Sequence, residues 1–127
     1  MDVPLSDFGR KQAFKLSECL SDAKFDTKHS SDLLRSIDTS FFATGFSDDV
    51  SRHRDLRELN FGEHEGLHFD NLPPKEKARF ADPNFKATGG ESWSDVRLRA
   101  TKFLASLDRG THLCFTHGGL ITAYLQA

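Results

Sequence analysis

Three polar clusters of the sequence carry residue types that together suit phosphoryl transfer. Arg35 is expected in the first turn of a helix, where its permanently charged fork adds to unpaired main-chain N–H groups and the positive end of the helix dipole. His117 precedes Gly118 and Gly119 at an expected strand-to-helix junction, so a ligand can approach the backbone closely. Glu58 could donate a proton to a leaving alcohol if its pocket favoured the protonated acid. Cations of this kind stabilise the equatorial oxygens of a transferring phosphoryl group.

Each of these residues also has an ordinary structural interpretation when it is taken alone. Arg35 follows two leucines, and such an arginine is more often a solvated helix residue than a ligand. Glu58 stands next to Arg57, which is the usual arrangement of surface charges. His117 is the strongest of the three because the glycines after it remove a packing explanation. The combination, rather than any single residue, indicates a site.

Helix caps and apolar spacing predict the elements that position the first two clusters. Ser6 can cap a helix that runs to about Leu20. A short extended piece then reaches residues 30–32, any of which could cap a second helix. Residues 52–61 are typical of a strand end followed by a loop, which carries Glu58.

The second half of the chain shows one more helix and a buried strand. A mostly polar segment begins at Pro73-Pro74, and Ser92 or Ser94 can then cap a helix. Residues 112–116 are typical of a buried strand, which leads to His117. After it we expect a tight turn at Gly118-Gly119 and a helix start over residues 120–125.

This alternation of strands and helices predicts an α/β layered fold. The 127 residues suffice for one compact domain, and no linker or change in composition divides them. In such folds ligands usually bind in the crevice beyond the carboxyl ends of the strands. All three polar clusters fall at positions of that kind, so we expect them to meet there.

Composition restricts the partners and the compartment. Seventeen Lys+Arg against nineteen Asp+Glu give a net charge of -2, and the basic residues are dispersed, so nucleic acid is not an expected partner. Cys19 and Cys114 cannot form a multi-bridge framework, which favours reducing conditions. No apolar stretch approaches membrane-spanning length and no leader is evident at the N-terminus. We expect a cytoplasmic protein without a membrane partner, and most of its twelve phenylalanines in the core.

Five blocks of the sequence, taken in order, resemble the histidine phosphatase superfamily, also called phosphoglycerate-mutase-like. Together they span nearly the whole chain, which makes the resemblance far more specific than any one block. The blocks are residues 2–13, residues 30–39, residues 56–66, residues 89–99 and residues 116–119.

The resemblance implies a three-layer α/β/α fold and a role for each candidate residue. Glu58 and His117 are the implied catalytic residues, as the acid and as a stabiliser of the transferring group. Four others are implied in binding the phosphate or the substrate, with Arg35 as the principal phosphate ligand: Arg35, Ser31, Gly118 and Glu91. The implied ligand is a small phosphorylated metabolite, and no metal or organic cofactor is implied. The block around Glu58 is similar to phosphatases such as α-ribazole phosphatase and fructose-2,6-bisphosphatase-like members more than to the mutases.

The sequence departs from the family pattern at its start. Members carry an Arg-His-Gly signature on the first strand, upstream of the block at residues 2–13, and its histidine is the nucleophile that forms a phosphohistidine. We therefore expect residues 1–127 to be an incomplete domain, truncated at the central strand and at the C-terminus, and inactive alone. The loop over residues 67–88 lies where members choose their substrate.

Two alternatives remain beside a phosphomonoester hydrolase or mutase. One is a catalytically inactive pseudophosphatase that keeps the anion pocket as a binding module. The other is a zinc hydrolase, since His64-Glu65-Gly66-Leu67-His68 matches a pattern in which two histidines on one helical face bind zinc. Gly62 and Gly66 weaken a helix there, which argues against zinc. The sequence leaves the oligomeric state open.

Overall fold

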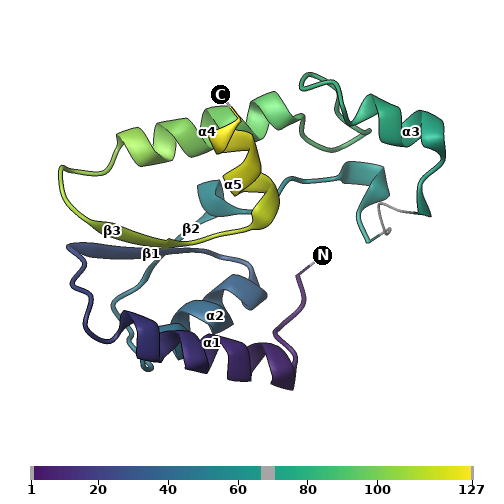
Figure 1. The fold of residues 1–127 in the computed structure, drawn as a ribbon. Helices are drawn as coiled ribbons and strands as arrows, with labels where there is room; N and C mark the ends of the chain where they lie inside the picture. Colours follow the sequence, from purple (N-terminus) through teal and green to yellow (C-terminus); the bar gives the residue numbers. More distant parts are fainter. Residues whose placement is uncertain (1, 67–70, 127) are drawn as a thin grey trace.

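A small parallel sheet lies between two layers of helices in the computed structural model, which describes residues 2–66 and 71–126 (Figure 1). The sheet has the strand order β2-β1-β3, so β1 is central. Its strands are β1 (Thr27–Ser31), β2 (Ser51–His53) and β3 (His112–Phe115). Figure 1 shows α1 (Asp7–Leu20) and α2 (Leu34–Ala43) on one face, with α4 (Trp93–Ala105) and α5 (Gly118–Leu125) on the other. The expected three-layer α/β/α fold is confirmed.

The register of the sheet brings the three polar clusters together. Both pairings are parallel, with Ser31 opposite His53 in β2 and Ser30 opposite Phe115 in β3. The carboxyl ends of all three strands therefore meet at one edge. From that edge β1 leads to the segment with Arg35, and β3 leads directly into the loop at His117.

Two helix starts agree with the sequence. The Ser6 hydroxyl accepts the Gly9 N–H at 3.0 Å and begins α1. Ser92 rather than Ser94 caps α4, where its hydroxyl accepts the Asp95 N–H and the Asp95 carboxylate accepts the Ser92 N–H in a capping box. Both signals are local, since each cap lies within three residues of its partner.

Two other expectations about helix starts are wrong. Helix α2 begins after Leu33, which offers no side-chain cap, because Ser30 and Ser31 belong to β1 instead. Gly118 and Gly119 form no tight turn but are the first two residues of α5, with His117 as its N-cap.

The polar middle of the chain forms a small separate lobe. Figure 1 shows α3 (Pro74–Arg79) away from the sheet, at the far end of α4. Its core consists of Leu72, Phe80 and Ala87, with Phe61 and Phe85 packed against them. Two short 3₁₀ helices, Arg54–Leu56 and Gly62–His64, lie between β2 and this lobe.

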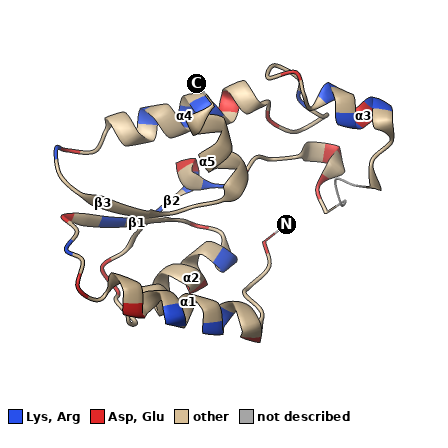
Figure 2. Cartoon of the chain, in the orientation of Figure 1, with Lys and Arg blue, Asp and Glu red and all other residues tan. Residues whose placement is uncertain are grey.

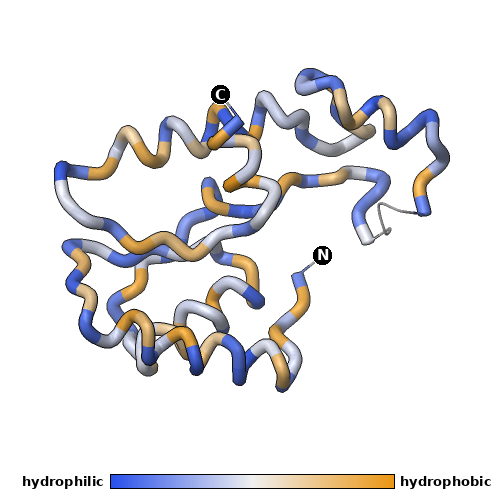
Figure 3. Tube along the Cα trace, in the orientation of Figure 1, coloured by the Kyte–Doolittle hydropathy of each residue, from blue (hydrophilic) through white to orange (hydrophobic). Residues whose placement is uncertain are grey.

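The main core lies between α4, α5 and the loop that carries Leu59. It is built from five buried residues with partly buried Phe61 and Trp93 against them: Leu59, Val96, Ala100, Leu120 and Ala123. Figure 3 shows hydrophobic colour along β3, whereas β1 is paler. Phenylalanine contributes less to the core than expected, since Phe8, Phe14, Phe41 and Phe46 are exposed.

No helix within residues 2–66 and 71–126 is long and apolar enough to cross a membrane.

Candidate active site

A cavity of about 430 Å³ opens at the carboxyl edge of the sheet. Arg35 from α2, Glu58 from the loop after β2, and Glu91 from the segment before α4 all line it. Three of the predicted site residues, which lie far apart in the sequence, thus meet in one cavity. The remaining lining residues are Leu33, Arg54, Asp55, Arg57, Leu59, Asn60, Glu65 and Arg99.

Glu58 is held by two main-chain donors. The Leu59 N–H donates to its Oε1 at 2.8 Å, and the Gly119 N–H donates to its Oε2 at 3.0 Å. The second bond places the carboxylate at the N-terminus of α5, where the helix dipole favours negative charge. Gly119 has to be glycine for this approach, because a Cβ at this position would overlap Glu58 Oε1.

His117 is not among the residues that line the cavity and is only 8% exposed. Its Nε2 shares a hydrogen bond of 2.8 Å with the Ser31 hydroxyl, which also accepts the Leu33 N–H. Burial is the main reason why the pKa of His117 is lowered; Arg35 lowers it further, and Glu58 opposes the shift. Arg35 and Glu58 therefore both act electrostatically on His117.

Ser31 and Gly118 lie outside the cavity lining. Ser31 is fully buried, and its hydroxyl serves His117 and the Leu33 N–H. Gly118 lies at the start of α5, and nothing lies within 4 Å of a Cβ built on it. Ser31 thus positions His117, while Gly118 leaves open space at the helix start.

Asp32 and Arg57 form a forked ion pair at the cavity. Arg57 Nε and Nη2 donate to the two carboxylate oxygens of Asp32 at 2.6 and 2.8 Å. These hydrogen bonds from Arg57 are the main reason why the pKa of Asp32 is lowered. The pair ties the end of β1 to the loop that carries Glu58, and it neutralises the charge of Arg57.

Arg99 of α4 ties the other side of the same loop. Its guanidinium donates to both oxygens of Glu91 at 2.9 and 3.1 Å, to the Asp55 carbonyl at 2.7 Å and to the Glu58 carbonyl at 3.1 Å. Glu91 also accepts the Asn60 N–H at 3.0 Å. Both oxygens of Glu91 therefore have partners within the protein.

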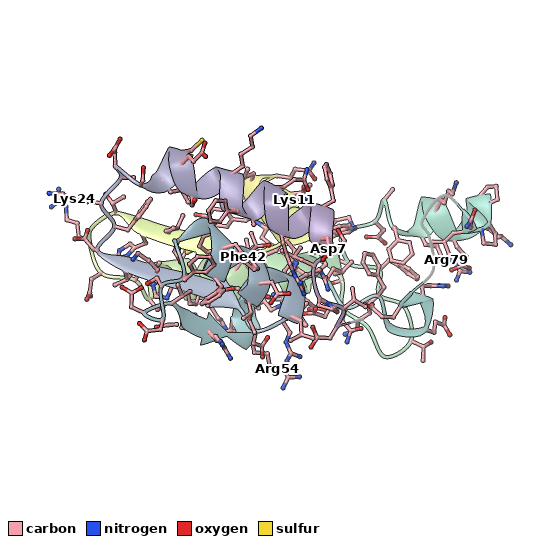
Figure 4. All side chains as sticks on the ribbon, turned by 90° about the horizontal axis from the view of Figure 1, so that it is seen from below. Asp7, Lys11, Lys24, Phe42, Arg54 and Arg79 are labelled. Carbon is pink, nitrogen blue, oxygen red and sulfur yellow. The ribbon has the colours of Figure 1, made fainter. Side chains whose placement is uncertain are left out.

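Arg54 and Asp55 are lining residues that the sequence did not indicate. They occupy the 3₁₀ turn directly after β2, which is the kind of position where ligand-binding residues occur in an α/β sheet. Figure 4 shows the Arg54 side chain extending from the ribbon to the edge of the molecule. Over the chain as a whole, Figure 2 shows positive and negative residues interspersed on both helical layers.

The zinc alternative finds little geometric support. His64 ends a single 3₁₀ turn, and Gly66 has a φ of 84°, so this segment is not a continuous α-helix. His68 lies outside the described residues. Within residues 2–66 and 71–126, no group of three or more His, Cys, Asp or Glu side chains is arranged to hold a metal ion.

Comparison with known proteins agrees with this geometry. The family model of the histidine phosphatase superfamily (branch 1) matches residues 1–127. The crystal structure of TTHB049 from Thermus thermophilus superposes with a TM-score of 0.86 at 37% identity, over 100% of this chain and 71% of that one. The chain belongs to the histidine phosphatase superfamily.

Two curated relatives are named as phosphatases. The fructose-2,6-bisphosphatase TIGAR of Xenopus tropicalis is 35% identical over 115 residues, which are 86% of this chain and 42% of that protein. The glucosyl-3-phosphoglycerate phosphatase of Mycolicibacterium vanbaalenii is 33% identical over 144 residues, covering 100% of this chain and 64% of that protein. The chain thus spans less than two thirds of the length of both relatives.

Proposed function

We propose that this chain forms the phosphate pocket of a phosphomonoesterase that acts on a small phosphorylated metabolite. The observation that carries the proposal is the meeting of Arg35, Glu58 and His117 at one edge of the sheet. A permanent cation, a carboxyl group and an imidazole are the groups that phosphoryl transfer uses for charge stabilisation and proton donation. The relatives named as phosphatases of phosphorylated sugars and glycerates support this substrate class.

Each residue has a separate role in the proposed reaction. Arg35 binds the equatorial oxygens of the phosphoryl group. The negative charge of a bound phosphate favours the protonated form of Glu58, which then supplies the proton for the leaving alcohol. His117 stabilises the transferring group rather than attacking it, because it is buried and its Nε2 is engaged by Ser31. The proposed phosphohistidine route needs a separate attacking histidine, which family members carry in an Arg-His-Gly signature, and residues 1–127 contain no such signature.

The lowered pKa of His117 gives anion binding a measurable signature. Burial and Arg35 both disfavour the imidazolium in the empty pocket. A phosphate beside Arg35 offsets that positive field and adds a negative charge near the ring, so the pKa of His117 rises. Binding of phosphate is then coupled to proton uptake near neutral pH.

The first test is binding of inorganic phosphate to the full chain, followed by calorimetry in buffers of different ionisation enthalpy. We expect binding with proton uptake, weakened about tenfold or more in Arg35→Gln because a charge-assisted contact is lost. Arg52→Gln is the matched control, since Arg52 is exposed on β2 outside the cavity. Equal phosphate binding by both variants would show that Arg35 does not bind the phosphate.

The second test restores the reaction. A family-type first strand with Arg-His-Gly is fused upstream of residue 1, and the product is assayed on phosphosugars and phosphoglycerates. We expect hydrolysis that falls by two or more orders of magnitude in Glu58→Gln and His117→Ala. Activity indifferent to both changes rules out the assigned site. Phosphate binding without hydrolysis of any phosphoester by the fused protein favours a binding module instead.

A further inference from the structure

Three histidines from three different strands are joined in one hydrogen-bonded chain beneath α4. His29 Nδ1 lies 2.9 Å from His53 Nε2, and His29 Nε2 lies 2.7 Å from the Thr27 hydroxyl. The same hydroxyl lies 2.5 Å from His112 Nδ1. His53 is in β2, Thr27 and His29 are in β1, and His112 is in β3. We call this group, His53–His29–Thr27–His112, the imidazole chain.

The far end of the imidazole chain fixes the direction of every proton in it. His112 Nε2 lies 2.6 Å from the Asp108 carbonyl oxygen, which can only accept. His112 Nε2 therefore carries the hydrogen, and in the neutral ring Nδ1 is an acceptor. Thr27 then has to donate its one hydroxyl proton to His112 Nδ1.

The order of donors and acceptors continues from Thr27 to His29 and His53. Since the Thr27 proton is used, the Thr27 oxygen accepts, and His29 Nε2 carries the hydrogen that it accepts. His29 Nδ1 is then the acceptor in the neutral ring, so His53 Nε2 donates to it. All three neutral imidazoles are thus in the Nε2–H form, with one proton in each link.

The surroundings disfavour additional charge on the middle ring. His29 is 7% exposed, and the Phe103 ring of α4 packs edge-on against it at 5.5 Å between centroids. The titratable groups that face it come from β2 and β3: His53, His112 and the Cys114 thiol, which pairs in register with His29. The pKa of Cys114 is raised by burial, so this thiol is neutral and supplies no counter-charge.

The imidazole chain can hold one extra proton without losing a link. A proton added to His53 at Nδ1 leaves its Nε2–H donation to His29 intact. A second proton, on His29 Nδ1, makes two donors face each other at 2.9 Å. A proton on His112 Nδ1 likewise ends the bond that Thr27 donates.

We propose that the imidazole chain is an acid-sensitive latch, which ties β2, β1 and β3 together while it is neutral and releases them when it takes up more than one proton. Release of β1 also affects the candidate active site, because β1 carries Ser31, whose hydroxyl is hydrogen-bonded to His117. Burial, and then His53 and His112, lower the pKa of His29. The latch requires this direction, because the folded state must disfavour protonation of His29. The proposal does not rest on the proposed function.

The sign of the pH effect follows from counting protons. Unfolded His29 binds a proton below the ordinary histidine pKa of about 6.5, whereas folded His29 loses the bond from His53 when it does so. Unfolding therefore takes up about one more proton in mildly acidic solution. The unfolding equilibrium constant rises up to about tenfold for each unit that the pH falls below about 6.5.

The direct experiment is ¹⁵N NMR of the histidine rings in the full chain. At about pH 8 we expect His29, His53 and His112 in the Nε2–H form, and we expect His29 to become protonated at a pH below its ordinary pKa of about 6.5. An Nδ1–H form at any of the three, or an ordinary titration of His29, overturns the proposal. This measurement needs no variant and is independent of phosphate binding.

A conservative pair of variants tests the latch itself. Thr27→Val removes the hydroxyl that both His29 and His112 need, whereas Thr27→Ser keeps it. We expect Thr27→Val to unfold more readily near pH 8 and to show a weaker pH dependence than the wild type, while Thr27→Ser retains both properties. Thr101→Val, at an exposed position of α4 outside the imidazole chain, should also behave as the wild type. Equal pH dependence in all four proteins overturns the latch.

Discussion

The carboxylate of Glu58 accepts a hydrogen bond of 3.0 Å from the main-chain N–H of Gly119, so the candidate acid is held at the N-terminus of α5. Sixty-one residues separate the two, and the contact depends on the absence of a side chain at Gly119. The second glycine after His117 is therefore needed for Glu58 rather than for a turn. The adjacent Gly118 has open space around it.

This difference between the two glycines can be tested by the same substitution at each. In Gly119→Ala the new methyl displaces the Glu58 carboxylate and ends its bond, which costs about 1–3 kcal/mol. In Gly118→Ala the methyl enters open space in the first turn of α5, and stability is unchanged or up to about 1 kcal/mol higher. Urea unfolding of both variants measures the two effects. Equal stability would contradict the close approach.

A second prediction concerns the buried serines between β1 and α2. The Ser36 hydroxyl donates to the Phe115 carbonyl at 3.0 Å and lies 2.9 Å from the Ser30 hydroxyl. Ser36→Ala leaves the Phe115 carbonyl without this donor, and we expect a loss of about 1–3 kcal/mol. Ser21→Ala removes an exposed serine and serves as the control, with a change within about 0.5 kcal/mol. Thermal unfolding distinguishes the two, and similar midpoints for both would show that the buried link is unimportant.

The sequence predicted those parts of the molecule that depend on neighbours in the chain. Ser6 and Ser92 could be recognised as helix caps because each binds an N–H three residues away. The order of strands and helices followed from the same local patterns. The meeting of Arg35, Glu58 and His117 could be expected because parallel strands place their carboxyl ends at one edge.

The sequence could not predict contacts whose partners lie on distant strands. Strand β1 is central but polar, and its last three residues are buried because each finds a hydrogen-bond partner elsewhere. His29 binds His53, 24 positions away, and Ser31 binds His117, 86 positions away. Glycines in a sequence usually indicate a turn. The structure instead has Gly119 at the start of a helix, where the close contact with the Glu58 carboxylate requires a glycine. The roles of Ser31 and Asp55 likewise depend on tertiary contacts.

The Asp32–Arg57 pair predicts an acid-dependent loss of stability. Hydrogen bonds from Arg57 lower the pKa of Asp32 from 3.8, so the carboxylate stabilises the fold above about that value. The contribution is lost as the pH falls through the lower pKa of the folded state. We expect Asp32→Asn to be less stable than the wild type near pH 6, and the difference to shrink as the pH falls towards and below the lowered pKa. Thermal unfolding over this range is the measurement, and a constant difference at all pH values would contradict the pair's role.

The last prediction concerns the effect of Arg35 on His117. The pKa of His117 is lowered mainly by burial and then by Arg35, while Glu58 acts in the opposite direction. Removing the positive charge in Arg35→Gln therefore raises the pKa of His117, so that the ring is protonated at a higher pH than in the wild type. Glu58→Gln removes the opposing charge and lowers this pKa.

Titration of the His117 ring by NMR measures both shifts, with Arg52→Gln as the control for loss of an arginine outside the cavity. The linked effect on stability has a definite sign. Because the folded pKa of His117 lies below its ordinary value of 6.5, its contribution is present above that value and declines as the pH falls towards the folded pKa. Arg35→Gln narrows the interval between the folded pKa of His117 and its ordinary pKa, and Glu58→Gln widens that interval. An unchanged pKa in both variants would show that burial alone sets the pKa of His117, and Arg35 and Glu58 would then not share a site with it.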